Sequence, residues 1–131
     1  MRTLIAEDEP ASLAALEKFF KEFGESVSVI DGLEAVEAFG KALDEGRPFD
    51  LVCMDIVMPG MDGIQAVKAI RAAENARGLP ARKAVKVLMV TALDDPRTVI
   101  QSFYRAGANA YLTKPLERRN LMARLKELHL A

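Results

Sequence analysis

The sequence predicts an α/β protein whose sheet is parallel and carries helices on both faces. Strand-like and helix-like segments alternate strictly along the 131 residues, with five of each kind. The segment 51–54, Leu-Val-Cys-Met, is apolar at every position, which is typical of a strand buried on both faces. Such strict alternation favours a doubly wound fold in which the strands run parallel to one another.

The expected strands are short runs of aliphatic and β-branched residues, each followed by polar residues or a turn. The second of them ends at Ile30 and precedes Asp31-Gly32, a dipeptide that marks turns. The expected strand ranges are 3–6, 26–30, 51–54, 85–90 and 110–112.

The expected helices begin at capping residues. Pro10 opens the first, because a proline in the first turn loses no hydrogen bond, and Gly24 closes it. Asp62 is a good N-cap for the third, and Asp95-Pro96 combines an N-cap with a first-turn proline for the fourth. The expected helix ranges are 10–23, 33–43, 63–73, 96–106 and 117–128. The polar stretch 74–83 is expected to be a surface loop with solvated arginines.

Length and composition indicate one domain over residues 1–131 that needs no disulfide to fold. The formal net charge of −1 and the pI near 5.9 argue against general binding to nucleic acid or to anionic membranes. Cys53 is the single cysteine and lies in an apolar run, so we expect it to fill the core. With neither a signal peptide nor a membrane-length apolar run, we expect a cytoplasmic protein.

Polar residues follow four of the predicted strands. Glu7 and Asp8 follow the first strand, Asp55 the third, Thr91 the fourth and Lys114 the fifth. The carboxyl ends of parallel strands meet at one edge of the sheet, where ligands bind in folds of this class. The five side chains are therefore expected to form one compact site, although each alone would be an ordinary capping, turn or strand residue.

The expected site has the chemistry of a cation and phosphoryl centre. Three neighbouring carboxylates raise one another's pKa unless a cation neutralises them, and Mg²⁺ prefers such oxygen ligands. Lys114 supplies a positive charge, and the Thr91 hydroxyl can donate to a phosphoryl oxygen. One carboxylate could act as a nucleophile and form an aspartyl phosphate.

The motifs at these strand ends resemble those of response-regulator receiver domains in two-component systems. The segment 55–63, Asp-Ile-Val-Met-Pro-Gly-Met-Asp-Gly, resembles the phosphoacceptor loop, and 7–10, Glu-Asp-Glu-Pro, resembles the acidic pair. The segments 90–92, Val-Thr-Ala, and 110–115, Ala-Tyr-Leu-Thr-Lys-Pro, resemble the switch threonine and the fifth strand with its lysine-proline signature. The resemblance covers essentially the whole chain. It implies a flavodoxin-like sheet with strand order 2-1-3-4-5.

The resemblance also implies roles at the acidic end of the site. Asp55 would accept the phosphoryl group. Mg²⁺ would be held by Asp8, Asp55 and the backbone carbonyl of Val57, and Glu7 would reach it directly or through water. The family often has aspartate at the position of Glu7. The domain would be a signalling switch that catalyses only its own phosphorylation and dephosphorylation, and not an enzyme in the ordinary sense.

At the other end of the site, the resemblance implies that Thr91 and Lys114 bind phosphoryl oxygens. The peptide bond between Lys114 and Pro115 would be cis, a form that only bonds preceding proline adopt cheaply. Thr91 would move toward the phosphoryl group, and Tyr111 would turn inward behind it. Phosphorylation would then bias an existing equilibrium between two states.

Two further positions in this family govern the lifetime of the phosphoryl group. Here they are Val57 and Leu93, two residues after Asp55 and Thr91. Both side chains are apolar and cannot orient an attacking water, so we expect slow autodephosphorylation.

The expected partners follow from the same resemblance. The only histidine, His129, is far from the motifs in sequence, so the donor would be a histidine kinase, a phosphotransfer protein or a small phosphodonor. If residues 1–131 are the full-length protein, we expect a stand-alone monomer or weak dimer that docks a target protein and binds no nucleic acid directly. The docking face would combine the fourth helix, fifth strand and fifth helix. It would expose Arg97, Gln101, Tyr104, Arg105, Arg118 and Arg119.

Three other functions remain open on the sequence. An aspartyl-nucleophile phosphatase of the haloacid-dehalogenase type would need a second aspartate where Val57 stands. A flavodoxin-like or dinucleotide-binding module would need a phosphate loop after the first strand, where Glu7-Asp8-Glu9-Pro10 would repel phosphate. The third is a receiver that docks partners without being phosphorylated.

Overall fold

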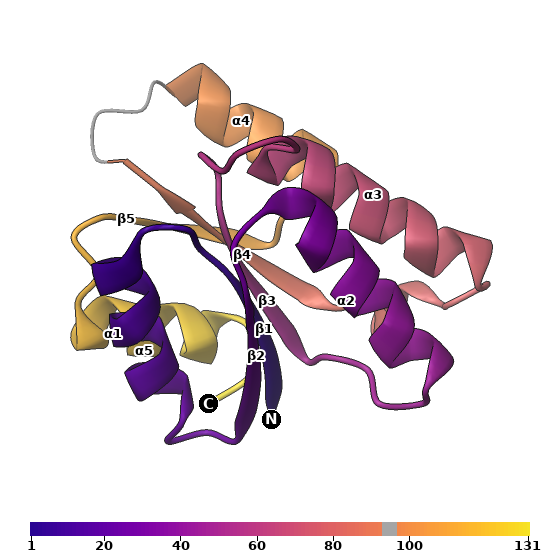
Figure 1. Cartoon of the computed structure of the whole chain (residues 1–131), viewed down its shortest axis with the longest axis horizontal. Coiled ribbons are helices and arrows are strands. Elements are labelled where there is room, and N and C mark those ends of the chain that lie inside the picture. The colour runs from indigo at the N-terminus through magenta and orange to yellow at the C-terminus, as the bar shows by residue number, and fades with distance from the viewer. Residues whose placement is uncertain (93–96) are drawn as a thin grey trace.

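Five parallel strands form one sheet in the order β2-β1-β3-β4-β5 (Figure 1), which confirms the expected topology. The structure is a computed structural model, and it describes residues 1–92 and 97–131. The strands are β1 (Arg2–Ala6), β2 (Glu25–Val29), β3 (Leu51–Asp55), β4 (Lys86–Thr91) and β5 (Ala110–Thr113).

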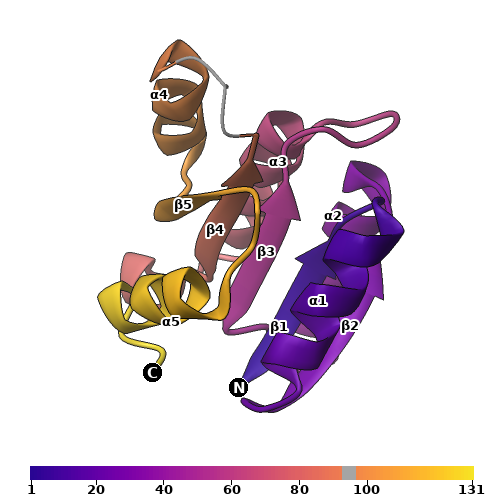
Figure 2. The same ribbon diagram turned by 90° about the vertical axis from the view of Figure 1, so that its left-hand side faces the viewer.

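Helices cover both faces of the sheet. Helices α1 and α5 lie on one face, and α2 and α3 lie on the other with α4 beside them (Figures 1 and 2). The helices are α1 (Pro10–Phe20), α2 (Gly32–Asp44), α3 (Gly63–Ala76), α4 (Arg97–Ala106) and α5 (Arg118–Glu127). A short 3-10 helix, η1 (Ala81–Lys83), precedes β4.

The alternation of side chains along the strands builds two cores, one on each face. On the α2–α3 side, Val52 and Met54 of β3 pack with Phe39, Ile70 and other buried residues. On the α1–α5 side, Leu51 and Cys53 pack with helix residues such as Leu16, Phe20 and Leu125. Cys53 is fully buried, as expected of a core residue, and burial raises the pKa of its thiol to about 12.

Several expected boundaries were wrong by a few residues. Helix α1 ends at Phe20 instead of 23, because a turn leads into Gly24, whose φ is +143°. A Cβ at Gly24 would lie 2.1 Å from the carbonyl oxygen of Met1, so only glycine fits there. The expected opening of α4 by Asp95-Pro96 lies outside the described residues.

The largest difference concerns the stretch 74–83, which was expected to be a surface loop. Helix α3 extends into this stretch as far as Ala76, and residues 81–83 form η1. Glu74 is only 4% exposed because its carboxylate pairs with Arg71 and accepts the Val85 amide. Arg77, expected to be solvated, donates two hydrogen bonds to the carboxylate of Asp44 on α2.

Candidate functional site

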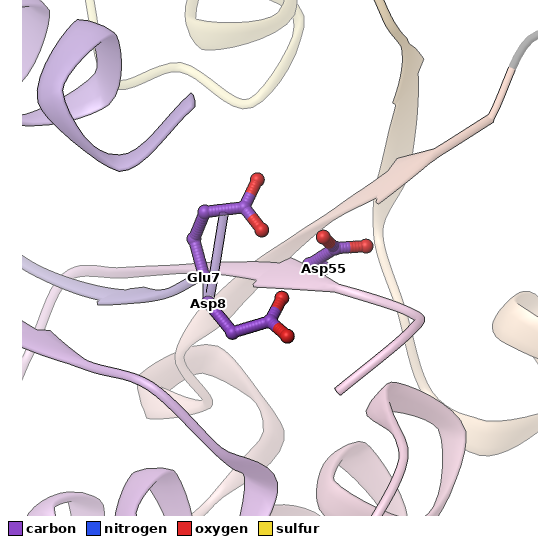
Figure 3. A group of neighbouring side chains, drawn as sticks. All are labelled: Glu7, Asp8 and Asp55. Atoms are coloured by element: carbon purple, nitrogen blue, oxygen red, sulfur yellow. The ribbon is translucent and has the colours of Figure 1, made fainter. Parts of the chain in front are cut away.

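Three carboxylates converge at the carboxyl edge of the sheet. Glu7 follows β1, Asp8 comes next in the chain, and Asp55 is the last residue of β3. One oxygen from each lies within 4.8 Å of the others. Figure 3 shows the carboxylates of Glu7 and Asp8 projecting toward the side on which Asp55 lies. The acidic residues predicted to share one site are therefore neighbours.

Local structure fixes the acidic pair after β1. The Glu7 amide donates to the carbonyl of Val29 at 3.1 Å, which extends the pairing with β2 one residue past the strand. The Glu9 side chain then caps α1 by accepting hydrogen bonds from the Ala11 and Ser12 amides at 3.3 and 2.7 Å. Glu7 is thereby buried at the strand end, while Asp8 is exposed beside it. The capping role of Glu9 was missed, because glutamate is a weaker signal for an N-cap than aspartate or serine.

The loop after β3 wraps around Asp55. The Val57 amide donates to Asp55 Oδ1 at 3.1 Å, and the Ile56 amide pairs with the Val90 carbonyl at 3.2 Å. The loop returns at Gly63, where a Cβ would lie 2.6 Å from the carbonyl oxygen of Asp55. Asp62 caps α3 and forms a capping box with Gln65, so its predicted capping role is confirmed.

Lys114 reaches the acidic group from the end of β5. Its ammonium nitrogen lies 3.0 Å from Glu7 Oε1 and 3.1 Å from Asp55 Oδ2. Its backbone amide donates to the carbonyl of Thr91 at 2.9 Å, so the ends of β4 and β5 stay together. The peptide bond between Lys114 and Pro115 is cis.

Burial decides the electrostatics of Glu7. Loss of solvation, with a smaller contribution from neighbouring Asp55, raises the pKa of Glu7 to about 7, although Lys114 opposes the shift. Partial burial alone would lower the pKa of Lys114, but its hydrogen bonds to Glu7 and Asp55 raise that pKa above the ordinary value. The ammonium is therefore charged at neutral pH, while Glu7 keeps its proton to a higher pH than an ordinary carboxyl.

Thr91 and Tyr111 lie on the β4–β5 side of the site. Thr91 is fully buried at the end of β4, pairs in register with Thr113, and donates from its hydroxyl to the Ala92 carbonyl at 3.3 Å. Tyr111 of β5 is half-buried and meets Tyr104 of α4 edge to face, with ring centres 6.3 Å apart. The Val57 side chain is 71% exposed, and Leu93 lies outside the described residues.

The acidic group fits a divalent cation. Three carboxylates and one ammonium leave a formal charge of −2 when all are ionised, which a divalent cation neutralises. Glu7 Oε1 is buried, and the Lys114 ammonium lies 3.0 Å from it. Carboxylate oxygens are the ligands that Mg²⁺ and similar hard cations prefer. The site is therefore able to hold a metal ion.

Three clustered carboxylates at the carboxyl edge of a five-stranded parallel sheet, with a lysine ammonium beside them, are typical of a receiver-type switch. The family model of the response regulator receiver domain matches residues 3–126. The chain belongs to the response regulator receiver domain family. Domains of this family are signalling switches of two-component systems and are not classical enzymes.

Among curated proteins, the chain is similar to receivers within larger proteins. It is 38% identical over 121 residues to the sensor protein GacS of Pseudomonas syringae pv. syringae, covering 92% of this chain and 12% of GacS. It is 34% identical over 125 residues to the transcriptional regulatory protein TorR of Escherichia coli O157:H7, covering 95% of this chain and 48% of TorR. The chain thus spans half or less of the length of these relatives.

Solved structures give the same fold. The receiver domain of the sensor histidine kinase PA1611 from Pseudomonas aeruginosa, which holds a magnesium ion in its active-site cleft, matches with a TM-score of 0.76 and 30% identity. That match covers 96% of this chain and 94% of the other. The Ssk1 receiver of Saccharomyces cerevisiae, solved with the phosphotransfer protein Ypd1, has a TM-score of 0.81 and 26% identity, covering 97% and 87%. A complex of CheX, CheY, BeF3 and magnesium from Borrelia burgdorferi matches with a TM-score of 0.80 and 26% identity, covering 100% of this chain and 90% of the other.

The helices in the described residues were also compared with the requirements of a membrane span. None of them is both long enough and apolar enough to cross a bilayer.

Proposed function

We propose that this domain accepts a phosphoryl group on Asp55 in a Mg²⁺-dependent step and thereby switches its affinity for a partner protein. The observation that carries the proposal is the position of the Lys114 ammonium, 3.1 Å from Asp55 and 3.0 Å from Glu7, beside the three clustered carboxylates. This arrangement brings together a nucleophilic oxygen, a group of carboxylates that can hold a cation and a fixed positive charge.

In the proposed step, an Asp55 oxygen forms a bond to phosphorus while the bond from phosphorus to the donor breaks. For a phosphohistidine donor, the electron pair of that bond leaves with the imidazole nitrogen. The Val57 amide already donates to Asp55 Oδ1 at 3.1 Å, which leaves Oδ2 on the Lys114 side as the attacking oxygen. Lys114 would then turn from the carboxylate to the transferred group.

Mg²⁺, when bound, supplies positive charge that offsets the negative charge growing on the phosphoryl oxygens. Glu7, Asp8 and Asp55 would hold it, with the Val57 carbonyl as a further ligand. Asp8 is the exposed member of the group. Glu7 has one methylene more than aspartate, so a water between Glu7 and the ion is the expected arrangement.

The switch would run from Thr91 to Tyr111. Thr91 would donate its hydroxyl to a phosphoryl oxygen, and Lys114 would bind a second oxygen. Tyr111 lies in register with Met89, two residues before Thr91 on β4, and would turn inward when Thr91 moves. Full inversion of such an equilibrium needs about 5.5 kcal/mol of differential stabilisation, so partial switching is the expected behaviour.

The donor would be a histidine kinase or a phosphotransfer protein. The Ypd1–Ssk1 complex, in which a receiver of this fold is bound to a phosphotransfer protein, supports this class of partner. His129 is exposed near the C-terminus, which lies beside the N-terminus at the amino ends of the strands (Figures 1 and 2). That edge is opposite the acidic site, which favours a donor on another molecule.

The target would dock on the face formed by α4, β5 and α5. A groove of about 420 Å³ runs between these elements, and Tyr104, Tyr111, Asn120, Arg124 and Glu127 are among its lining residues. Exposed Arg97 and Arg105 make the α4 side basic. Arg118 is exposed, and it pairs with Glu22 in the turn after α1 and stacks 5.6 Å from the centre of the Phe19 ring. We propose that residues 1–131 act as one cytoplasmic receiver domain, monomeric or weakly dimeric.

Intact mass after incubation with Mg²⁺ and acetyl phosphate tests the proposal, with the wild type beside Asp55→Asn. We expect a gain of one phosphoryl group in the wild type, none in the variant, and none when EDTA replaces Mg²⁺. Unchanged mass in the wild type at every Mg²⁺ concentration would refute phosphorylation and favour a domain that docks without it. Steady turnover of p-nitrophenyl phosphate would point instead to a phosphatase.

A further inference from the structure

The guanidinium of Arg71 ties three segments together at the end of the molecule away from the acidic site. Arg71 lies on α3, and its Nε and Nη2 donate to the Gly107 carbonyl at 3.1 and 2.8 Å. Nη2 also donates to Asn109 Oδ1 at 3.0 Å, and Nη1 donates to Glu74 Oε1 and to the Val85 carbonyl, both at 2.8 Å. All five N–H groups of the side chain are therefore used.

The partners of Arg71 are themselves held in place. Glu74 is 4% exposed, and its second oxygen accepts the Val85 amide at 2.7 Å. Asn109 Oδ1 also accepts the Val87 amide at 2.8 Å, and the Asn109 amide donates to the Val87 carbonyl at 2.9 Å. These bonds set the start of β5 against β4. A network with every member satisfied is rigid, because any displacement leaves a buried polar group unpaired.

The contact is also sterically tight. Gly107 has φ of +115°, and a Cβ there would lie 2.8 Å from Arg71 Cγ. The backbone of the turn between α4 and β5 therefore lies directly against the arginine side chain. A guanidinium suits this position, because its planar fork reaches two carbonyls and two side chains at once, whereas a lysine ammonium cannot.

The turn that Arg71 holds lies between the two elements that carry the aromatic residues of the proposed switch face. Tyr104 lies three residues before Gly107 on α4, and Tyr111 lies two residues after Asn109 on β5. Their edge-to-face contact joins the two elements above the turn. A displacement that begins at Thr91 and Tyr111 would therefore move α4 and β5, which are bonded to α3 at the turn that connects them.

We propose that Arg71 anchors the turn 107–109, so that α4 and β5 respond to the site as a lever pivoting on that turn. Arg71 is a positioning residue and touches no reacting group. The inference rests on the proposed phosphorylation of Asp55 for the signal that moves the lever. The anchor itself is a property of the unphosphorylated domain.

Amide hydrogen exchange by NMR tests the anchor without any ligand. The amides of Gly107, Ala108 and Asn109 donate to the carbonyls of Tyr104, Phe103 and Val87, so each reports opening of the turn. In the wild type we expect these three amides to exchange about tenfold or more slowly than those of residues 99–103. In Arg71→Met the difference should vanish. Arg77→Met is the matched control, since Arg77 is the C-cap residue of the same helix but pairs with Asp44 on α2.

Beryllofluoride with Mg²⁺, used as the phosphoryl mimic, then tests the pivot. In the wild type we expect amide shifts to change in residues 99–104 and near Tyr111, with residues 107–109 unchanged. In Arg71→Met the changes should spread into 107–109, while Arg77→Met behaves as the wild type. If Arg71 only stabilised the fold, Arg71→Met would have a lower melting temperature, but the same residues as in the wild type would change their amide shifts. Arg71→Lys, which keeps charge but not the fork, serves if the methionine variant does not fold.

The two failures are distinguishable. Residues 107–109 that exchange as fast as residues 99–103 in the wild type, or stay slow in Arg71→Met, would overturn the anchor. Shifts that reach 107–109 in the wild type on addition of beryllofluoride would overturn the pivot. No shift at Asp55 or Lys114 in the wild type would count against the proposed function, and the exchange rates without ligand would still decide the anchor.

Discussion

The ammonium of Lys114 bridges two buried carboxylates, with its nitrogen 3.1 Å from Asp55 Oδ2 and 3.0 Å from Glu7 Oε1. Glu7 is fully buried and Asp55 is 6% exposed, so neither carboxylate is well solvated. One cation cannot neutralise both of these groups and the adjacent Asp8. Burial, with a smaller contribution from the neighbouring negative charge of Asp55, explains why Glu7 favours its proton. The remaining negative charge explains why the same site suits a divalent cation.

Replacing Lys114 should separate metal binding from phosphoryl transfer. Lys114→Met removes a charge that repels the cation, so we expect Mg²⁺ to bind about tenfold more tightly. The rate of phosphorylation by acetyl phosphate should fall by about 10²- to 10³-fold, because the transferred oxygens lose a fixed positive charge. Mg²⁺ titration followed by NMR and intact mass would measure the two effects.

The control for this variant is Lys68→Met on α3, an exposed lysine with no ion pair among the described residues. It should leave both quantities within about twofold of the wild type. An equal loss of Mg²⁺ affinity and of phosphorylation in Lys114→Met would contradict the separation.

The stability of the metal-free protein should fall as pH rises toward neutrality. Folded Glu7 keeps its proton up to a pKa of about 7, whereas the unfolded carboxyl loses it near 4.5. Between these values the folded state binds more protons than the unfolded state. The free energy of unfolding therefore decreases with pH, with a slope of up to about 1.4 kcal/mol per pH unit from this group. Urea denaturation in EDTA at pH 5, 6 and 7 would measure it.

Glu7→Gln should remove that slope, since glutamine does not titrate. Below pH 4.5 the Glu7 carboxyl is protonated in both the folded and the unfolded protein. The stabilisation that Glu7 contributes is therefore complete there and is lost as pH rises to about 7. An identical pH slope in wild type and Glu7→Gln would show that other groups cause it.

Mg²⁺ affinity should have the opposite pH dependence. A cation binds the ionised carboxylate, so a proton on Glu7 competes with it. We expect the affinity to increase by up to about tenfold per pH unit below pH 7 and to level off above it. Calorimetric titrations from pH 5.5 to 8.5 would give the curve. A flat curve would mean that Glu7 is not linked to the metal. Glu7→Asp should level off at lower pH, since the shorter side chain is less enclosed.

The close approach of Gly63 to the end of β3 should make this position sensitive to a single added methyl group. A Cβ there would lie 2.6 Å from the Asp55 carbonyl oxygen and 2.8 Å from Ile56 Cα, so backbone would have to move. We expect Gly63→Ala to lower the free energy of unfolding by about 1–3 kcal/mol and to slow phosphorylation. Chemical denaturation together with intact mass would test this.

Gly40→Ala is the matched control for Gly63→Ala. Gly40 lies within α2, and its nearest neighbour for a Cβ is the Arg77 side chain at 3.4 Å, an ordinary contact. That substitution should stabilise the protein by about 0.5–1 kcal/mol, since alanine loses less backbone entropy in a helix than glycine. Equal destabilisation of both variants would show that the site plays no part in the effect of Gly63→Ala.

Much of the site could be predicted because strand ends are visible in the sequence. An apolar run that stops at Glu7, Asp55, Thr91 or Lys114 fixes where the chain leaves the sheet. In a parallel sheet those exits share one edge, so the residues had to be neighbours once the strands were paired. Helix starts were equally readable, as Asp62 shows, because capping bonds join residues two or three apart.

The contacts that tertiary structure decided join residues far apart in the chain. Arg71 and Gly107 are 36 residues apart, and Lys114 and Asp55 are 59 apart. The sequence gives no sign that Glu74 is buried, because its burial depends on which backbone groups of β4 arrive beside it. Likewise, the pKa of Glu7 depends on how much solvent the assembled sheet and Lys114 exclude. Local chemistry and strand periodicity thus determined which residues form the site. Packing between distant segments alone decided their charge states and the element to which the α4–β5 turn is fixed.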